Sequence, residues 1–131
     1  MPYLQLDVPS HYSVDVKRRL ARRLGDVFAR IMQTTPDKVT IAFRELGDGG
    51  VWRCSDGEPE PAALLTCDIR RGRSPEQRAE LASALVDACV EALGLRIDQL
   101  GVEFTQHAGD EFFRGERGLA ADWTPAEAQT A

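Results

Sequence analysis

The sequence predicts an α/β (α+β) fold in which one β-α-β unit occurs twice in tandem. Two observations support this prediction. Apolar residues alternate in short runs, as in strands, and recur every three or four residues in longer runs, as in amphipathic helices. The two halves also match without gaps at a shift of 61 residues, so that Asp7 falls on Asp68 and Ser13 falls on Ser74.

The first unit opens with a period-2 strand over residues 2–8. Ser13 is the natural N-cap of a helix over residues 14–32, whose apolar side chains recur on one face. The segment 34–37 ends this helix, because the residue before a proline disfavours helical conformation. Alternating apolar residues then predict a second strand over residues 39–45.

The second unit repeats this order. A strand is expected over residues 63–69, followed by a loop at Arg70–Arg73. Ser74 then caps a helix that continues to Leu93, with Pro75 at its first position. A fourth main strand is expected around residues 100–104.

Turn and linker composition divides the chain. Residues 1–54 form the first unit, 55–62 a linker rich in Pro, Gly and acidic residues, 63–123 the second unit, and 124–131 a polar tail. Short strands are expected at Val51–Arg53 and at the similar segment Phe112–Arg114. The length suits a single compact domain overall.

The repeat restricts the architecture. A β-α-β unit has parallel strands and a right-handed crossover, so two units can make one four-stranded sheet with both helices on one face. We expect the other face to carry apolar side chains such as Val39 and Val102. Such a face must be covered, which predicts an oligomer.

Composition excludes several classes of function. The net charge of -5 argues against nucleic acid as a partner. No run approaches the ~20 apolar residues of a membrane span, and the start lacks a signal-peptide pattern. We therefore expect a cytoplasmic protein that binds no membrane. His11 and His107 show no paired metal-ligand spacing, so no metal is predicted.

Positions at which the two copies differ are candidates for function, because residues that only maintain the fold should match in both copies. Pro2 falls on Ala63, and only Pro2 can become a free secondary amine, provided that Met1 is removed. An α-amino group titrates near ~8, and burial or nearby positive charge lowers that pKa. Such an amine is a candidate general base, although a proline after the initiator is also common without any function.

The strand-to-helix corner also differs. Residues 9–12 fall on Arg70–Arg73, which contains three arginines. Arginine binds carboxylates through two parallel hydrogen bonds, and the N-terminus of the following helix adds positive potential. The alternative is that Arg70, Arg71 and Arg73 are a solvated surface cluster.

These residues together resemble a known family. The N-terminal proline, the segment Pro36–Val39 and the turn from Glu45 to Trp52 are similar to the 4-oxalocrotonate tautomerase group of the tautomerase superfamily. The segment Ile69–Gln77 is similar to fused-domain members, namely the cis-3-chloroacrylic acid dehalogenases and malonate semialdehyde decarboxylases. The resemblance implies a tautomerase/MIF-like fold, a homotrimer, and neither cofactor nor metal.

The resemblance also implies residue roles. Pro2 would be the general base or acid, and Arg70, Arg71 and Arg73 would bind the substrate carboxylate. Trp52 would form an apolar pocket wall, its alternative being ordinary core or interface packing. Glu103, Glu111 and Glu116 are further tentative site residues.

The chain departs from the family at several positions. Thr40, with Gly101 in the other copy, stands where short-chain tautomerases have a further arginine. Phe28 and Glu103 replace a histidine and a tyrosine of the cis-dehalogenases, whose water-activating glutamate corresponds to either Glu111 or Glu116. Asp37 fits the position of the decarboxylase aspartate, but its repeat partner Asp98 favours a structural turn.

The first functional hypothesis is therefore a tautomerase that moves a proton between oxygen and carbon of a small 2-hydroxydienoate or 2-oxo acid, with Pro2 as base. The first alternative keeps Pro2 cationic, as an acid in hydration and dehalogenation of 3-haloacrylates or in decarboxylation of 3-oxo acids. The second alternative is a non-catalytic carboxylate-binding oligomer.

Overall fold

A computed structural model describes residues 2–119, so Met1 and the predicted polar tail at 124–131 lie outside the described residues. The tandem repeat is confirmed. Each main element of the second half has a counterpart that begins about 61 residues earlier, as Pro75 of the second helix follows Val14 of the first. None of the helices in residues 2–119 has the length and apolar character that crossing a membrane requires.

Both long helices begin and end where the sequence predicts. Helix α1 is Val14–Met32, and the Ser13 side chain accepts a hydrogen bond from the Val16 amide. Helix α2 is Pro75–Leu93, and the Ser74 side chain accepts one from Gln77. These caps satisfy amides that lack a partner within the helix. Gly94 ends α2 at a φ of 66°, in the left-handed region that glycine adopts without strain.

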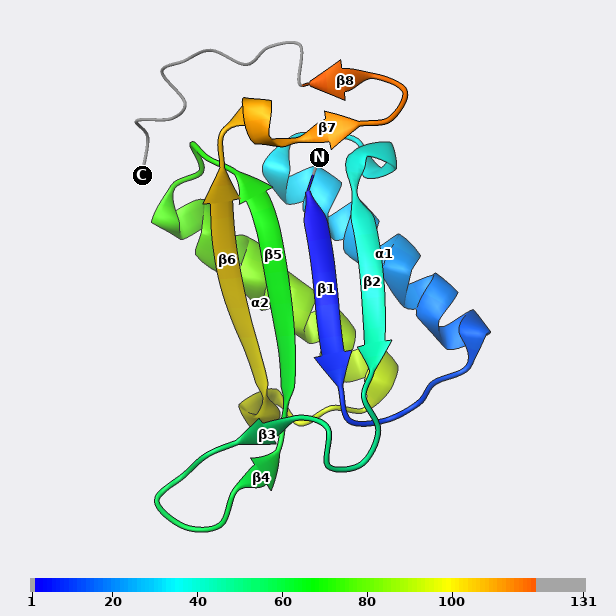
Figure 1. Ribbon diagram of the computed structural model, residues 1–131, viewed down its shortest axis with the longest axis vertical. Helices are drawn as coiled ribbons and strands as arrows, with labels where there is room; N and C mark the ends of the chain where they lie inside the picture. The colour runs from blue at the N-terminus through cyan, green and yellow to red at the C-terminus, as the bar shows by residue number, and fades with distance from the viewer. Residues whose placement is uncertain (1, 120–131) are drawn as a thin grey trace.

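Four main strands form one sheet in the order β2-β1-β5-β6 (Figure 1). They are β1 Tyr3–Val8, β2 Thr40–Glu45, β5 Ala63–Arg70 and β6 Leu100–His107. Pairing is parallel within each unit, β1 with β2 and β5 with β6, as a helical crossover requires. At the centre β1 pairs with β5 in the antiparallel direction, with Tyr3 opposite Asp68.

Two short hairpins extend the sheet's ends. Strand β3, Trp52–Arg53, pairs with β4, Glu60–Pro61, so part of the predicted linker forms a ladder instead of an irregular connection. Strand β7, Phe113–Arg114, pairs with β8, Gly118–Leu119. Single turns of 3-10 helix precede β2 and β6, η1 at Pro36–Lys38 and η2 at Ile97–Gln99, and η3 at Gly109–Glu111 precedes β7. Figure 1 shows the two hairpins at opposite ends of the sheet.

Both helices cover one face of the sheet, and the core lies between the two layers (Figure 1). The fully buried strand residues are every second one along β1 and β5: Leu4, Leu6, Val8, Leu65, Cys67 and Ile69. Burial raises the pKa of both core thiols, Cys67 and Cys89, to about 12, so neither is a thiolate nucleophile at neutral pH.

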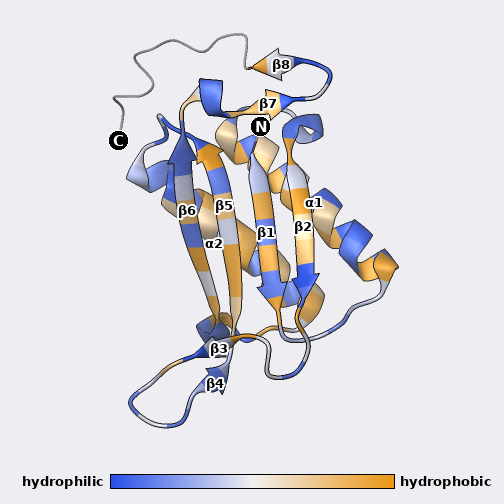
Figure 2. Cartoon of the chain, viewed as in Figure 1, coloured by the Kyte–Doolittle hydropathy of each residue, from blue (hydrophilic) through white to orange (hydrophobic). Residues whose placement is uncertain are grey.

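The expected apolar character of the other face was wrong. Val102 pairs with the buried Leu65 and packs into the core, as does Val39. The open face instead carries polar side chains, including an ion pair of 2.6 Å between Arg44 Nε and Asp7 Oδ1. Figure 2 shows the resulting alternation of hydrophobic and hydrophilic residues along the strands. A need to cover apolar surface therefore gives no reason for oligomerisation through this face.

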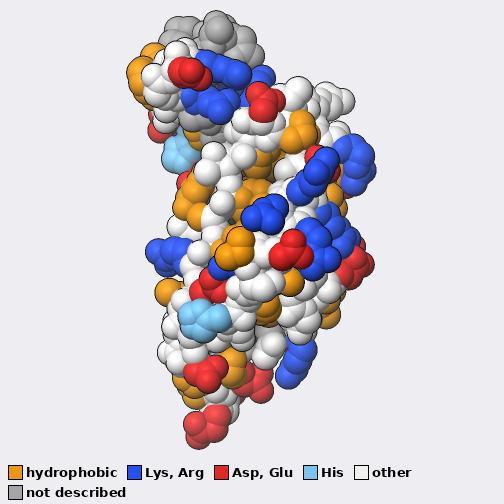
Figure 3. All heavy atoms as spheres, turned by 90° about the vertical axis from the view of Figure 1, so that its right-hand side faces the viewer, with side chains coloured by type: hydrophobic (Ala, Val, Ile, Leu, Met, Phe, Trp, Pro, Cys, Tyr) orange, Lys and Arg blue, Asp and Glu red, His pale blue; other side chains and the backbone are white. Residues whose placement is uncertain are grey.

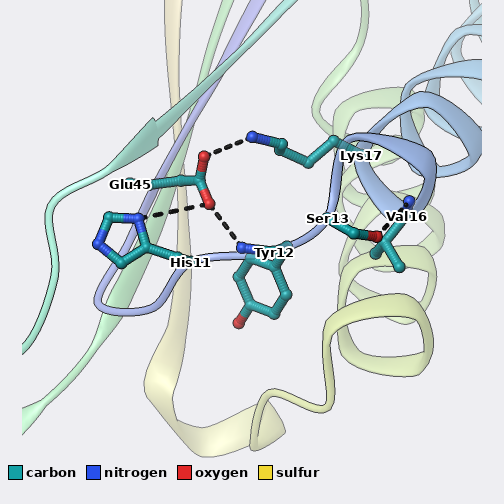
Figure 4. A network of polar contacts seen from close by, with 6 residues as sticks. All are labelled: His11, Tyr12, Ser13, Val16, Lys17 and Glu45. Carbon is teal, nitrogen blue, oxygen red and sulfur yellow. Dashed lines mark hydrogen bonds and ion pairs between the residues drawn. The ribbon is translucent and has the colours of Figure 1, made fainter.

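A carboxylate ties the first strand-to-helix loop to β2 (Figure 4). Glu45 Oε1 accepts a hydrogen bond of 2.5 Å from Lys17 Nζ, and Glu45 Oε2 accepts one of 2.6 Å from the Tyr12 amide. His11 Nδ1 lies 3.7 Å from the same carboxylate. The Lys17 contact, then the Tyr12 amide, hold the pKa of Glu45 below its usual 4.5.

Replacing this carboxylate should lower stability in a pH-dependent way. A group whose pKa is depressed by folding stabilises the fold while it is ionised, so this contribution is present above pH ~4.5 and is lost as the pH falls through the lowered folded value. We expect Glu45→Gln to lower the melting temperature by a few degrees at pH 7, with the difference from wild type shrinking below pH ~4.5.

Asp15→Asn is the matched control, because Asp15 pairs with Arg18 and Arg19 on a surface where all three side chains are at least two-thirds exposed. Thermal melts between pH 3 and pH 7 make the comparison. An equal effect of both substitutions, or a Glu45→Gln difference independent of pH, would contradict the role given to Glu45.

Candidate active site

The antiparallel centre of the sheet brings Pro2 to the arginine corner. Tyr3 lies opposite Asp68, so the residue before Tyr3 reaches the end of β5, where Ile69 and Arg70 lead into the loop. The Pro2 carbonyl accepts a hydrogen bond of 3.1 Å from the Thr40 amide on the neighbouring strand. The start of β1 is thereby held between β2 and β5.

A cavity of about 530 Å³ opens at this point and draws on both halves of the chain. Its apolar lining comes from Pro2, Phe28, Met32, Ile69, Phe112 and Leu119. Its cationic lining comes from Lys38, Arg70, Arg73, Arg114 and Arg117. None of the described lining residues is a carboxylate, so the cavity favours a small anion with an apolar body.

Two of the cations that line this cavity, Arg114 and Arg117, make different contacts. Arg117 lies 3.7 Å from Asp37 in an exposed ion pair, so part of its charge is offset. Arg114 has a buried Nη1 without a hydrogen-bond partner among residues 2–119, which is unusual for a guanidinium and suits an anion acceptor. Figure 3 shows one group of Lys and Arg side chains at the end of the molecule where β7 and β8 lie in Figure 1, and others spread along the face below it.

Arg73 is held in place by α1 and α2. Its Nη2 donates to the Met32 carbonyl at 3.4 Å, at the C-terminus of α1. Its own carbonyl accepts a hydrogen bond of 2.8 Å from Arg78 Nη1. Gln77, one residue earlier on α2, donates to the Ile31 carbonyl at 3.0 Å. The corner is therefore a defined structure and not a freely solvated loop.

A second cavity of about 430 Å³ lies on the open side of the sheet and is also lined by Pro2. It contains Asp68, His107 and Glu111. Glu111 accepts a hydrogen bond of 2.9 Å from the Ala108 amide and lies 3.3 Å from His107 Nδ1. These two contacts, the amide first, lower the pKa of Glu111, so this carboxylate is ionised at neutral pH.

The structure brings together only some of the residues singled out in the sequence. Pro2, Arg70 and Arg73 line one cavity. Arg71 does not line it, and its amide donates to the His107 carbonyl at 2.9 Å, beside β6. Trp52 is 54% exposed on β3, at the opposite end of the sheet, so it cannot form a wall of the cavity in its own chain (Figure 1).

The three tentative glutamates lie in different places. Glu111 lines the second cavity. Glu103 is an exposed residue of β6 opposite Thr66, farther along the strand from Pro2, and Glu116 is exposed in the turn between β7 and β8. Neither of these two glutamates lines the 530 Å³ cavity or the 430 Å³ cavity.

Lys38, Arg114 and Arg117 were missed as site residues. Lys38 belongs to η1, and the two arginines belong to the β7–β8 hairpin, which folds over the start of β1. The match of Arg53 with Arg114 in the repeat was a usable signal for one of them. No group of three or more His, Cys, Asp or Glu side chains within residues 2–119 is placed to hold a metal ion.

Comparison with known proteins identifies the fold. No family model matches the sequence, and no curated protein matches it at a significant level. Solved structures do match. A member of the cis-3-chloroacrylic acid dehalogenase family, N1, is similar with a TM-score of 0.78 and 18% identity, over 90% of this chain and 83% of that chain.

Two further structures agree. A wild-type fused 4-OT, described as a symmetric trimer, is similar with a TM-score of 0.77 and 22% identity, over 91% of this chain and 95% of that chain. Macrophage migration inhibitory factor of Toxoplasma gondii is similar with a TM-score of 0.74 and 18% identity, over 88% and 98%. At these identities the likeness shows the fold, and the predicted tautomerase/MIF-like architecture is confirmed.

The charge of the cavity generates a binding prediction. We expect Arg73→Ala to weaken binding of a small carboxylate such as 2-oxobutanoate about 10- to 100-fold, because charge-assisted hydrogen bonds to the carboxylate are lost. Calorimetric titration measures this. Arg19→Ala is the control, because Arg19 is 73% exposed on α1 and pairs with Asp15. Equal affinity of Arg73→Ala and wild type would remove Arg73 from the site.

Proposed function

We propose that this chain is a fused, 4-oxalocrotonate tautomerase-like member of the tautomerase superfamily, and that it catalyses enol-keto proton transfer on a small 2-hydroxydienoate or 2-oxo acid. The observation that carries the proposal is that Pro2, Arg70 and Arg73 line one cavity. The fold is compatible with this activity, and the apolar and cationic linings suit a small carboxylate with a hydrocarbon body.

Pro2 acts as the general base in this mechanism. Removal of Met1 exposes the prolyl amine, and the cations around the cavity disfavour its protonated form, so that the amine is neutral near pH 7. It takes the proton of the enol hydroxyl. The O–H electron pair becomes the carbonyl π bond, and the C=C pair forms a C–H bond with the proton that the ammonium returns.

The arginines bind the substrate and stabilise charge. Arg73, fixed at its backbone and at its guanidinium, binds the carboxylate, and Arg70 lies beside it at the end of β5. As the enol loses its proton, negative charge develops on the adjacent oxygen. Donors that are already in position stabilise that charge without reorganising.

A hydratase or dehalogenase acting on 3-haloacrylates is the alternative that a specific observation favours. Glu111 is an ionised carboxylate in the second cavity, which Pro2 also lines, and this supports a role for Glu111 in activating water while a cationic Pro2 acts as acid. Decarboxylation of 3-oxo acids has less support. Asp37 belongs to the η1 turn, lines neither of the two cavities that Pro2 lines, and pairs with Arg117 of the β7–β8 hairpin.

We propose a homotrimer as the working assembly. Fused 4-OT proteins with this fold are described as symmetric and asymmetric trimers. The exposed Trp52 on β3, at the far end from its own cavity, is available to form a wall of a neighbouring subunit's cavity. Light scattering that returned the mass of a single 14.5 kDa chain would exclude the trimer.

Pro2 is the test of the proposed chemistry. We expect Pro2→Ala, and equally a protein that retains Met1, to lose at least ~100-fold in kcat/KM for enol substrates. The substitution replaces the ring-held secondary amine by a freely rotating primary amine, and a retained Met1 converts the prolyl nitrogen into an amide. An ultraviolet assay of ketonisation measures the rate, and intact mass establishes whether Met1 is present. Pro9→Ala, at the other end of β1, should keep full activity.

The pH dependence separates the first two candidate functions. A neutral prolyl base makes activity fall as the pH drops through the pKa of the amine. An ammonium acid makes activity fall as the pH rises through it. Full activity of Pro2→Ala would sink both, and carboxylate binding without turnover by the processed protein would favour the non-catalytic binding oligomer.

A further inference from the structure

The tandem repeat contains a polar bridge at equivalent positions of its two copies. Lys17 and Arg78 correspond at the repeat shift, and so do Glu45 and Gln106. In the first copy, Lys17 and the Tyr12 amide both donate to Glu45 (Figure 4). In the second copy, Arg78 Nη1 donates to Gln106 Oε1 at 3.1 Å and to the Arg73 carbonyl at 2.8 Å.

Both bridges perform one mechanical task. Each bridge connects the helix, the end of the unit's second strand and the strand-to-helix loop, although the connecting group differs. It is the Glu45 carboxylate in the first copy, which accepts from Lys17 and from the loop, and the Arg78 guanidinium in the second copy, which donates to Gln106 and to the loop. In the first copy the loop residue is Tyr12, and in the second copy it is its counterpart Arg73. Arg78 therefore fixes the backbone of the arginine that lines the cavity, while the Met32 carbonyl contacts its guanidinium.

The two bridges differ in charge. Glu45 offsets the charge of Lys17, but Gln106 is a neutral amide. Within residues 2–119 no carboxylate lies within ion-pair distance of Arg78. The half-buried Arg78 guanidinium thus leaves a net positive charge beside the Arg73 backbone, whereas Glu45 offsets the charge of Lys17 at the corresponding corner of the first copy.

We propose that Arg78 is a positioning residue for Arg73, and that the amide at Gln106 leaves the positive charge of Arg78 free to strengthen anion binding at the cavity. The inference rests on the proposed function in one respect, namely that Arg73 binds the substrate carboxylate. It does not depend on the chemistry at Pro2.

Gln106→Glu tests whether the uncompensated charge of Arg78 strengthens anion binding. The substitution replaces the amide by a carboxylate of nearly the same shape and keeps an oxygen acceptor for Arg78. We expect about 3-fold weaker binding of 2-oxobutanoate at low salt, and a smaller difference at high salt, from the added negative charge near the site. In turnover the same change should raise KM and leave kcat unaltered, and thermal melts should show undiminished stability.

Glu45→Gln is the matched control in the other copy. It makes the reciprocal exchange at the equivalent position, remote from the cavity, and should leave 2-oxobutanoate binding unchanged at a temperature where both proteins are folded. A salt-independent effect of Gln106→Glu, or an equal effect of the control, would overturn the electrostatic part of the inference.

Arg78 itself is tested by a pair of variants. Arg78→Met should weaken binding roughly 10-fold, because Arg73 loses its backbone tether and the nearby charge. Arg78→Lys should restore part of that loss, because the lysine ammonium keeps the positive charge and is a hydrogen-bond donor for the Arg73 carbonyl. Wild-type affinity in Arg78→Met, or no rescue by lysine, would contradict the positioning role.

The outcomes separate this inference from the proposed function. If wild type binds 2-oxobutanoate in an Arg73-dependent manner while Gln106→Glu and Arg78→Met bind as wild type, the inference alone fails. If wild type shows no Arg73-dependent binding, the carboxylate site of the proposed function fails and the inference fails with it.

Discussion

The antiparallel pairing of β1 with β5 determines where Pro2 lies relative to Arg70 and Arg73. Within a single β-α-β unit, the start of the first strand and its strand-to-helix corner are at opposite ends of the sheet. Because the two units meet in opposite directions, the start of β1 lies beside the corner of the other unit. Pro2 therefore comes next to Arg70 and Arg73, which neither unit alone could provide.

Buried side chains fix this pairing. Leu4 and Leu6 of β1 face Cys67 and Leu65 of β5 in register, and all four are fully buried beneath the helices. A slip of one residue would turn Gln5 and Thr66 toward the core and expose the leucines, so the register is strongly specified. The position of Pro2 relative to the arginine corner is thus set by the hydrophobic core and not by contacts within the cavity.

The duplication also explains why, within residues 2–119, an N-terminal residue meets an arginine corner at one end of the sheet and not at the other. The reciprocal end of the sheet brings the start of β5 to the first unit's corner. There Ala63 is preceded by more chain and offers no amine, and the corner holds the Glu45 network in place of three arginines. The two ends of the sheet have the same backbone arrangement but different charges. The end with Pro2 and Arg73 has a cation-lined cavity, and the end with Glu45 has an ion pair that holds the loop.

Local patterns in the sequence predicted much of the fold. Caps at Ser13 and Ser74 gave the starts of both helices, and the repeat placed Pro2 and the arginine corner in complementary copies. The prediction of an apolar outer face was wrong because Val102 lies two residues from both Leu100 and Phe104 on β6. All three side chains therefore point to the same face of the sheet, toward the helices. Lys38 and Arg117 were missed because turns and a hairpin bring them to the cavity, and no periodic pattern encodes that placement.

The most direct test of the account is the titration of the Pro2 nitrogen in protein that has lost Met1, followed by 15N NMR after labelling with [15N]proline. We expect the amine to titrate below the ~8 that is usual for α-amino groups, and we expect Arg73→Ala to raise its midpoint toward that value. A midpoint at or above ~8 that is the same in Arg73→Ala would contradict the claim that the cation-lined cavity makes Pro2 a neutral base.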